Sequence, residues 1–288
     1  MHAWRKSGPL AAGVVAVSLA AGCAAAKLSA ADIVAKNVAA RGGLDAWRKV
    51  GTMVWVGRVE SAHTPVPSMP FELEQKRPNK TRLQIDALGD KSVRVFNGVH
   101  GWKVRPGRGR PGVEPYTPQE LKSAQAGHGI DGPLIDYAAK GNRVTLEGVD
   151  EIGGRKAYHL GVRPAKGGNE DVWVDAETFL DIRYDRAVDD PAGAQRRVSA
   201  TYGDYRAVEG LQIPFLIETG GGPGATPDKM QIERVVLNAP LDDWTFENPA
   251  SPRPRHRGRA GVAPQIRAPT APSTAPSAAS EEEGSAPQ

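Results

Sequence analysis

Between residues 53 and 237 the hydrophobic residues of this chain recur at every second position, in one short segment after another. Because the side chains of a β-strand point alternately to the two faces of a sheet, this period of two predicts half-buried strands. The alternation is clear at 53–59, 71–74 and 82–85. Most links between such segments are short and rich in turn residues, so neighbouring strands must run antiparallel. The chain is therefore expected to be built on one antiparallel sheet.

Further segments with the same pattern extend the sheet. Asn97-Gly98 is a strong hairpin signal that joins a strand at 93–95 to one that holds Trp102 and Val104. Later strands are expected at 144–149, 156–162, 171–175, 179–186, 196–205, 211–218 and 230–237. Altogether the pattern predicts about a dozen strands.

Four helices are expected beside these strands. Ser29-Ala30-Ala31-Asp32 is a capping box that begins the first helix, and Gly42 ends it. Residues 44–50 form a second short helix. Thr117-Pro118-Gln119-Glu120 has the cap, the first-turn Pro and the acid that begin a third, and residues 131–140 form the fourth. Helices packed on one face of an antiparallel sheet define an α+β fold.

Residues 1–22 have the pattern of an export signal. Arg5 and Lys6 precede an uncharged stretch rich in Ala, Val and Leu, which is shorter than the ~20 residues that span a bilayer. The stretch ends in Leu19-Ala20-Ala21-Gly22-Cys23, which resembles the lipobox of bacterial lipoproteins, where cleavage precedes a Cys that carries a diacylglyceryl group. The alternative is an ordinary signal peptide with a chance cysteine. We expect Cys23 to be lipidated.

Cys23 is the only cysteine, so the chain has no internal disulfide framework, and residues 23–250 must fold around their own hydrophobic core. From residue 251 onward Pro, Ala, Ser and Arg dominate without apolar periodicity. Such a segment buries too little surface to offset the entropy of ordering it, and 251–288 is expected to be a disordered tail. The tail either contacts anionic lipid or cell wall or is a soluble appendage.

The net charge of +4 and the pI of about 9.2 suggest an anionic partner at first sight. The signal holds two basic residues, and the tail holds five Arg and three Glu, which leaves 30 basic and 30 acidic residues between them. Nucleic-acid binding requires a concentrated basic face, which a neutral body does not offer. No nucleic-acid partner is expected.

No catalytic motif stands out. The sequence has no GxSxG elbow, phosphate-binding P-loop or dinucleotide fingerprint. Asp131 and Asp136 lie at an expected helix start, where carboxylates usually cap the helix and contact solvent. The histidines show no HxxxH or HxH spacing, so neither a metal nor another cofactor is expected; they include His63, His100, His128 and His159. We expect a protein that is not an enzyme, with an unrecognised hydrolase as the lesser alternative.

Several short motifs follow one another along residues 29–247. They are Arg41-Gly42-Gly43-Leu44-Asp45-Ala46-Trp47 before Gly51-Thr52-Met53, Asp131-Gly132-Pro133-Leu134-Ile135-Asp136-Tyr137 before Gly154-Arg155-Lys156-Ala157-Tyr158, Trp173-Val174-Asp175-Ala176-Glu177-Thr178-Phe179-Leu180, and Tyr205-Arg206-Ala207-Val208-Glu209-Gly210-Leu211-Gln212-Ile213-Pro214. In order and spacing they resemble the LolA/LolB-like outer-membrane lipoprotein-sorting family. The resemblance implies a curved antiparallel half-barrel of about eleven strands, with helices covering its concave face.

The resemblance also implies a cavity that shelters the acyl chains of lipids or lipoproteins. Each buried methylene contributes about 0.8 kcal/mol, so such a cavity needs apolar residues beyond those of the core. Candidates are Trp55, Phe71, Leu73, Leu83, Ile85, Val93, Val95, Trp102, Tyr158, Leu160, Trp173, Ile182, Tyr184, Phe215 and Ile217. The alternative is that they pack helices against the sheet, and we expect fewer than half to touch a ligand.

We therefore expect a monomeric, periplasm-facing protein of the cell envelope that binds lipid or lipoprotein acyl chains and is anchored in a membrane through lipidated Cys23. The anchor makes the chain more similar to the receptor type of the family than to its soluble carriers. Ala24 stands where an Asp favours inner-membrane retention, which points to the outer membrane. The alternative function is an anchored envelope scaffold or stress sensor that uses the same fold to bind a protein partner.

Overall fold

The computed structural model describes residues 27–252, apart from residue 65 and the segments 106–111, 190–193 and 221–225. Within this part of the chain, all strands belong to one 13-stranded antiparallel sheet. They are β1 (Thr52–Glu60), β2 (Ser68–Lys76), β3 (Lys80–Ala87), β4 (Asp90–Phe96), β5 (Gly101–Val104), β6 (Val113–Pro115), β7 (Arg143–Ile152), β8 (Arg155–Arg163), β9 (Glu170–Asp175), β10 (Asp181–Asp189), β11 (Gln195–Val208), β12 (Leu211–Gly220) and β13 (Asp228–Leu237).

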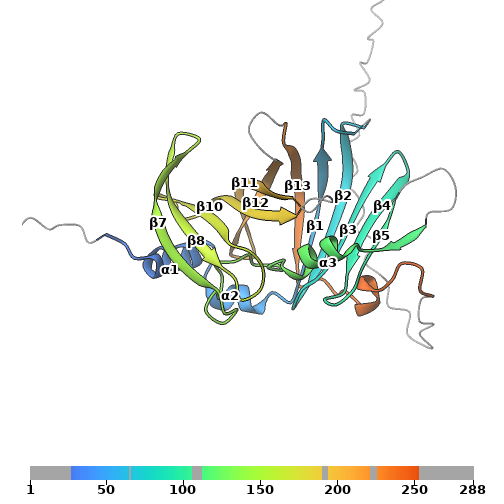
Figure 1. The fold of residues 1–288 in the computed structure, drawn as a ribbon, viewed down its shortest axis with the longest axis horizontal. Helices are drawn as coiled ribbons and strands as arrows, with labels where there is room; N and C mark the ends of the chain where they lie inside the picture. Colours follow the sequence, from blue (N-terminus) through green and yellow to red (C-terminus); the bar gives the residue numbers. More distant parts are fainter. Residues whose placement is uncertain (1–26, 65, 106–111, 190–193, 221–225, 253–288) are drawn as a thin grey trace, which may run out of the picture. The chain divides into compact units, whose positions relative to one another are not determined.

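The sheet consists of two meanders that meet at their first and last strands. Its order is β6-β5-β4-β3-β2-β1-β13-β12-β11-β10-β9-β8-β7, so β1 pairs with β13. Figure 1 shows the two meanders curving away from this junction. The predicted curved antiparallel sheet is confirmed. Its strand number exceeds the predicted eleven or twelve because β6, at three residues and with a Pro, carries too little alternation to be recognised.

The helices are α1 (Ala30–Ala40), α2 (Leu44–Lys49), α3 (Pro118–Gln125) and the 3₁₀ turn η1 (Asp243–Phe246). The predicted caps at Ser29 and Thr117 both form, and each is a capping box, with Asp32 and with Glu120. Gly42 follows α1 at a φ of 107° and is indispensable there, because a Cβ would lie 2.5 Å from the carbonyl oxygen of Gly210.

The helix predicted at 131–140 is wrong. The structure has a series of turns there. Gly132 and Asp136 take φ values of 74° and 53°, in the left-handed region, which a right-handed helix does not admit. Leu134 and Ile135 are nevertheless fully buried. The spacing of the apolar residues in this segment therefore reflects tertiary packing and not helical periodicity.

The strand register separates the two faces of the sheet. We call the inner face the one that carries Trp55, Leu73 and Tyr184; cross-strand partners share a face in an antiparallel sheet. Trp47 of α2 packs in the main core cluster with Trp55, and Ile33 and Val34 of α1 pack on Leu160 of β8. Helices therefore cover the inner face, as predicted.

The opposite, outer face has a smaller cover of its own. Val93 and Val95 of β4 pack against Phe246 of η1, which is fully buried. η1 also lies against β3 in the fold (Figure 1). Among the described residues, no helix is both long and apolar enough to cross a membrane. The predicted signal at 1–22, Cys23 and residues 253–288 of the predicted tail lie outside the described residues.

Candidate functional site

A cavity of about 260 Å³ remains on the inner face, between the sheet and the segment 127–142, which we call the cover segment. Most of its wall is apolar. The lining residues are Arg41, Trp47, Trp55, Leu73, Gln75, Gly129, Ile130, Gly132, Pro133, Val172, Asp181, Tyr184, Tyr202, Tyr205, Ile213, Pro214, Ile217 and Met230. The wall thus combines strands of both meanders with the end of α1, with α2 and with the cover segment.

Of the fifteen residues predicted for a ligand cavity, Trp55, Leu73, Tyr184 and Ile217 line this one. Six others lie on the inner face but pack in the core. Phe71 and Phe215 belong to the main cluster, Leu83 and Ile85 pack against it, and Tyr158 and Leu160 pack in the cluster beneath α1. These six pack beside the cavity wall or extend the apolar surface of the inner face beyond it.

The remaining five predicted residues lie on the outer face. Val93, Val95 and Trp102 pack beside η1. Trp173 and Ile182 form a separate cluster with Ala157. The reason lies in the register: Leu83 is opposite Arg94, so the valines on either side of Arg94 point away from the cavity.

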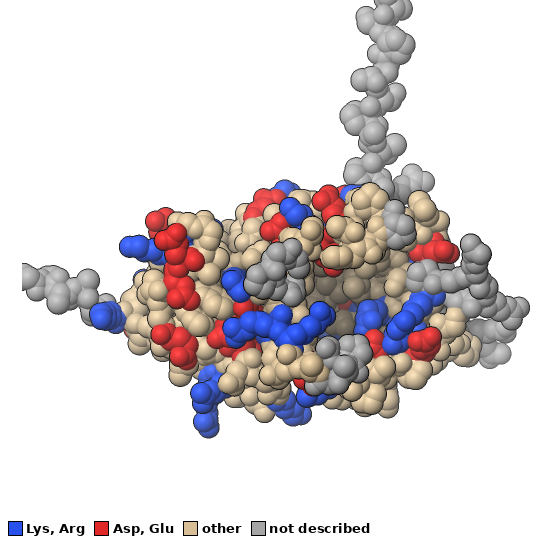
Figure 2. Space-filling model, turned by 45° about the horizontal axis from the view of Figure 1, so that its top comes forward, with Lys and Arg blue, Asp and Glu red and all other residues tan. Residues whose placement is uncertain are grey.

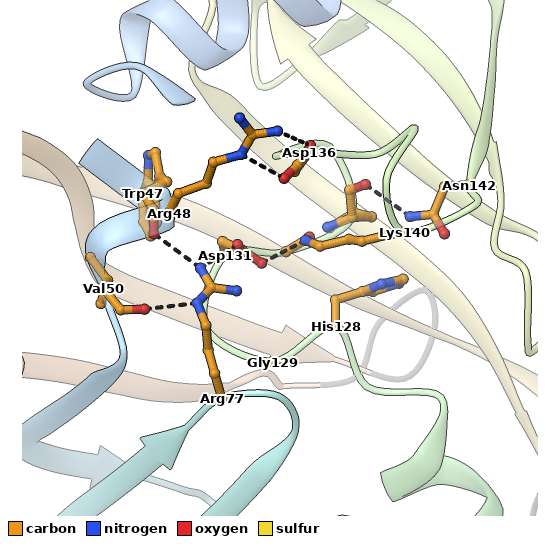
Figure 3. A network of polar contacts seen from close by, with 12 residues as sticks. Trp47, Arg48, Val50, Arg77, His128, Gly129, Asp131, Asp136, Lys140 and Asn142 are labelled. Atoms are coloured by element: carbon orange, nitrogen blue, oxygen red, sulfur yellow. Dashed lines mark hydrogen bonds and ion pairs between the residues drawn. The ribbon is translucent and has the colours of Figure 1, made fainter. Parts of the chain in front are cut away.

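The cover segment is held down by ion pairs centred on Asp131 (Figure 3). The Asp131 carboxylate, almost completely buried, accepts hydrogen bonds from Arg77 Nη2 and from Lys140 Nζ, each at 2.6 Å. Arg77 also donates to the carbonyl oxygens of Val50, at 2.7 Å, and Trp47, at 3.0 Å. One arginine therefore ties the cover segment to the end of α2.

A second ion pair lies further along the cover segment, at Asp136. Arg48 of α2 makes two hydrogen bonds to Asp136, at 2.8 and 2.9 Å, and half of its side chain is exposed (Figure 3). The guanidinium of Arg48 lowers the pKa of the Asp136 carboxyl. The two aspartates that the sequence places at a helix start instead fasten a series of turns to the neighbouring elements.

Beneath the cover segment the cavity wall contains a buried polar cluster at the end of α1. Arg41 Nη1 lies 3.2 Å from Asp181 Oδ2, and Asn37 donates to the other carboxylate oxygen at 2.9 Å. The Arg41 guanidinium also stacks on Trp47 at 4.6 Å. Two buried donors in this wall have no hydrogen-bond partner in the described part of the chain, Arg41 Nε and Trp55 Nε1.

Burial shifts the ionisation of this cluster toward neutral forms. It raises the pKa of the Asp181 carboxyl, against the opposing effect of Arg41, and it raises the pKa of the hydroxyls of Tyr202 and Tyr205. Burial also lowers the pKa of Lys140, although Asp131 partly restores it. A cavity with such walls has a low effective dielectric and favours an uncharged guest.

A larger and more open pocket of about 620 Å³ lies beside α3, and we call it the basic pocket. Figure 2 shows a hollow on the face turned to the viewer, with Lys and Arg at its border. The lining residues are Arg94, Lys103, Arg105, Tyr116, Thr117, Gln119, Glu120, Ser123, Ala124, Arg186 and Asp189. This pocket was not predicted from the sequence, because its cations come from separate strands and the net charge of the body is neutral.

Glu120 fixes part of the basic pocket. It accepts from Lys103 Nζ at 2.8 Å and from Arg94 Nη2 at 3.1 Å. Burial alone would raise its pKa, but the hydrogen bonds from Lys103, the Thr117 N–H and Arg94 prevail and lower the pKa to about 2. Glu120 is therefore a permanent anion that orients two of the cations.

Two histidines have acidic partners. His128 Nε2 lies 2.5 Å from Glu170. His159, stacked on Trp173 on the outer face, lies 2.9 Å from Asp171. No group of three or more His, Cys, Asp or Glu residues in the described part of the chain is arranged to hold a metal ion.

No family model and no curated protein sequence matches the chain. Solved structures do match it. The structure is similar to that of a DUF1329 family protein from Desulfovibrio piger, with a TM-score of 0.50 and 12% identity over 76% of this chain and 97% of that one. A LolA superfamily protein from Nitrosomonas europaea gives 0.49 and 14%, over 77% and 98%. A putative outer membrane lipoprotein-sorting protein domain from Vibrio parahaemolyticus gives 0.48 and 11%, over 75% and 94%.

At these identities the likeness is one of fold. The shared fold is that of the DUF1329 family protein, and it includes the curved antiparallel sheet that the sequence motifs predict. The cavity wall also contains residues that the sequence analysis did not select, among them Arg41, Tyr202 and Tyr205. Arg41 belongs to the first of those motifs, and its place directly before two glycines was the one signal that could have singled it out.

Proposed function

We propose that this protein is a lipid-anchored protein of the cell envelope that shelters an acyl chain in the inner-face cavity, for transport or sorting toward the outer membrane. The observation that carries the proposal is the cavity itself. It has a volume of about 260 Å³, its wall is mostly apolar, and it lies between the sheet and the fastened cover segment. An apolar wall of this kind lacks packing partners that a hydrocarbon chain would supply.

The size of the cavity suits part of one chain. Pockets for drug-sized ligands typically measure about 300–1,000 Å³, so a cavity of about 260 Å³ lies just below that range. Burying about eight methylenes contributes roughly 6 kcal/mol, which corresponds to a dissociation constant between 1 mM and 1 µM. A longer chain would continue over Leu83 and Ile85, which lie partly exposed on the inner face between the cavity and the basic pocket.

Binding rather than turnover is the activity proposed. Three ionisable residues of the cavity wall are engaged in structural contacts: Asp181 pairs with Arg41 and accepts from Asn37, and Tyr205 donates to the Asp181 carbonyl at 2.9 Å. Those contacts connect α1 to β10 and β11, which is a structural role.

The test uses a soluble Cys23→Ala form whose bound lipids are extracted and identified by mass spectrometry, followed by titration with a fluorescent fatty-acid probe. Ile217→Trp fills the cavity and should lower probe affinity about tenfold or more, whereas Val99→Trp, at an exposed turn, should leave it unchanged. Protein that is isolated without lipid and takes up no probe would refute the proposal.

The anchor is tested separately. Cys23→Ala should move the full chain from the membrane fraction to the soluble fraction, and labelled palmitate should enter the original chain alone. Retention of Cys23→Ala in the membrane would remove the anchor from the proposal without affecting the cavity.

A second candidate function is an anchored scaffold or stress sensor that binds a protein partner. It is favoured by β7, which is an edge strand within the described part of the chain and exposes Leu146 and Val149. An edge strand offers backbone hydrogen-bonding groups to a partner strand. A partner strand would be blocked by Val149→Pro, which should leave probe uptake intact. Native mass spectrometry separates the two functions, because a carrier retains lipid and a scaffold retains a protein.

A further inference from the structure

We propose that the basic pocket binds the phosphate-bearing head of the same amphiphile whose hydrocarbon chain occupies the cavity, so that the guest is an anionic lipid. The inference rests on the proposed function of the cavity. It adds the chemical class of the guest, its orientation, and the residues that select the head.

The strand register places the basic pocket and the cavity on one continuous face. Leu73 of the cavity is opposite Leu83 of β3, and Leu83 is opposite Arg94 of β4. On the other meander, Arg186 follows Tyr184 of the cavity by two positions on β10 and therefore points to the same face. The inner face thus passes from apolar to basic between β2 and β4 on the first meander and along β10 itself on the second.

The charges in the basic pocket do not cancel. Arg94, Lys103, Arg105 and Arg186 line it together with two carboxylates, Glu120 and Asp189. Lys103 and Arg94 share the single carboxylate of Glu120. Lys122, outside the pocket lining, pairs with Asp189 at 2.8 Å and neutralises it. Arg105 lies 3.9 Å from Glu114, outside the lining. Arg94, Lys103 and Arg186 against Glu120 still leave the lining a positive excess.

Arg186 contributes one full charge to this excess. Across the described residues it has neither an ion pair nor a side-chain hydrogen bond, although its side chain is only partly exposed. Its guanidinium faces a pocket that also contains the hydroxyls of Thr117 and Ser123. A planar guanidinium beside hydroxyl donors matches the several acceptor oxygens of a phosphate better than a single carbonyl.

The other cations are already oriented for such a group. Arg94 stacks on Tyr116 at 4.9 Å and is held by Glu120, so its remaining N–H groups are fixed in direction before a ligand arrives. Preorganised donors lose little side-chain entropy on binding. In the wall of the neighbouring cavity, by contrast, burial raises the pKa of Asp181 and of Tyr202 and favours their neutral forms. Most of that wall is apolar and suits the uncharged chain.

The experiment compares lipids that share their acyl chains and differ in the head. The soluble Cys23→Ala protein is titrated with short-chain phosphatidylglycerol, with the matching phosphatidylcholine, with the matching diacylglycerol and with glycerol phosphate alone. Phosphatidylglycerol should bind about tenfold more tightly than diacylglycerol, and the advantage should shrink as the salt concentration rises from 50 to ~500 mM. Glycerol phosphate should bind far more weakly than the whole lipid.

The variants assign the effect to the pocket. Arg186→Gln should reduce the affinity for phosphatidylglycerol about tenfold and leave that for diacylglycerol unchanged, while Arg186→Lys should keep most of it. The matched control is Arg234→Gln, which removes the same charge from an exposed position on the outer face, opposite Val56. Circular dichroism and the melting temperature check that each variant is folded.

Three outcomes overturn the inference and spare the cavity: equal affinity for phosphatidylglycerol and diacylglycerol, an equal loss in Arg234→Gln, or glycerol phosphate that binds as tightly as the lipid. Phosphatidylcholine that binds as tightly as phosphatidylglycerol overturns the selection of a net anionic head. Failure of every lipid and of the fatty-acid probe to bind is a different result, because it refutes the proposed function itself.

Discussion

Replacing Asp131 by Asn should loosen the cover segment over the cavity. The substitution keeps the size of the side chain and removes its charge. Arg77 and Lys140 would then face an amide that offers one acceptor in place of two charged oxygens, each now 2.6 Å from a cation. Arg77 would keep its contacts with the carbonyl groups of Trp47 and Val50, so the loss should be concentrated in the cover segment.

The size of the effect follows from the burial of the three groups. Removing one partner of a buried ion pair typically costs about 3–5 kcal/mol. The Asp131 side chain is 3% exposed, but those of Arg77 and Lys140 are 32% and 25% exposed and can turn toward water. We therefore expect the free energy of unfolding to fall by about 2–3 kcal/mol, and the melting temperature of a domain of this size by roughly 5–10 °C.

Asp136→Asn is the matched control, because it makes the same chemical change five residues further along the cover segment. Its partner Arg48 is 53% exposed, and an ion pair of that kind contributes about 0–1 kcal/mol. Thermal unfolding followed by circular dichroism measures stability, and hydrogen exchange of peptides from 127–142 measures local opening. If Asp131→Asn had the melting temperature of the unaltered protein and exchanged no faster in that segment, the ion pairs of Asp131 would have no energetic role.

Two further predictions concern α3 and the junction of the meanders. The pKa of Glu120 is lowered to about 2 from its usual 4.5, so its contribution to stability is complete above about pH 4.5 and is lost as the pH falls from there toward 2. The difference in melting temperature between the protein and Glu120→Gln should therefore close over that range. A difference that stays constant would contradict the assignment. Gly57→Ala should lower the free energy of unfolding, measured in urea, by at least ~2 kcal/mol, because a Cβ there would lie 2.1 Å from the Gln231 carbonyl oxygen. Gly148 has open space around it, so Gly148→Ala should change that free energy little. Equal effects of the two substitutions would refute the argument from close approach.

Local signals in the sequence located most of the elements. The Asn97-Gly98 hairpin forms, with the Asn97 side chain accepting hydrogen bonds from the N–H groups of Val99 and His100. The caps at Ser29 and Thr117 form as well. Each of these depends on residues within four positions of one another, which is the range over which a sequence pattern is explicit.

The candidate site was harder to predict because it depends on pairing between strands. Alternation shows that Val93 and Val95 share a face, but only their register with β3 shows that this face is the outer one. The cavity wall likewise combines Trp55 of β1 with Tyr184 of β10, which no local pattern connects. The buried pair of Arg41 and Asp181 was missed for the same reason, since 140 positions separate its members along the printed sequence.

The junction between β1 and β13 has a consequence for how the chain reaches its folded state. The two strands are hydrogen-bonded along their length, from Met53 opposite Leu237 to Glu60 opposite Lys229, yet almost the whole domain lies between them in the sequence. The two meanders cannot pair until β13 has been synthesised. The edge of β1 that pairs with β13 therefore stays unpaired while the rest of the domain is made. During that interval the exposed edge of β1 can pair with another chain, so the late delivery of β13 makes this edge a site of aggregation risk during folding.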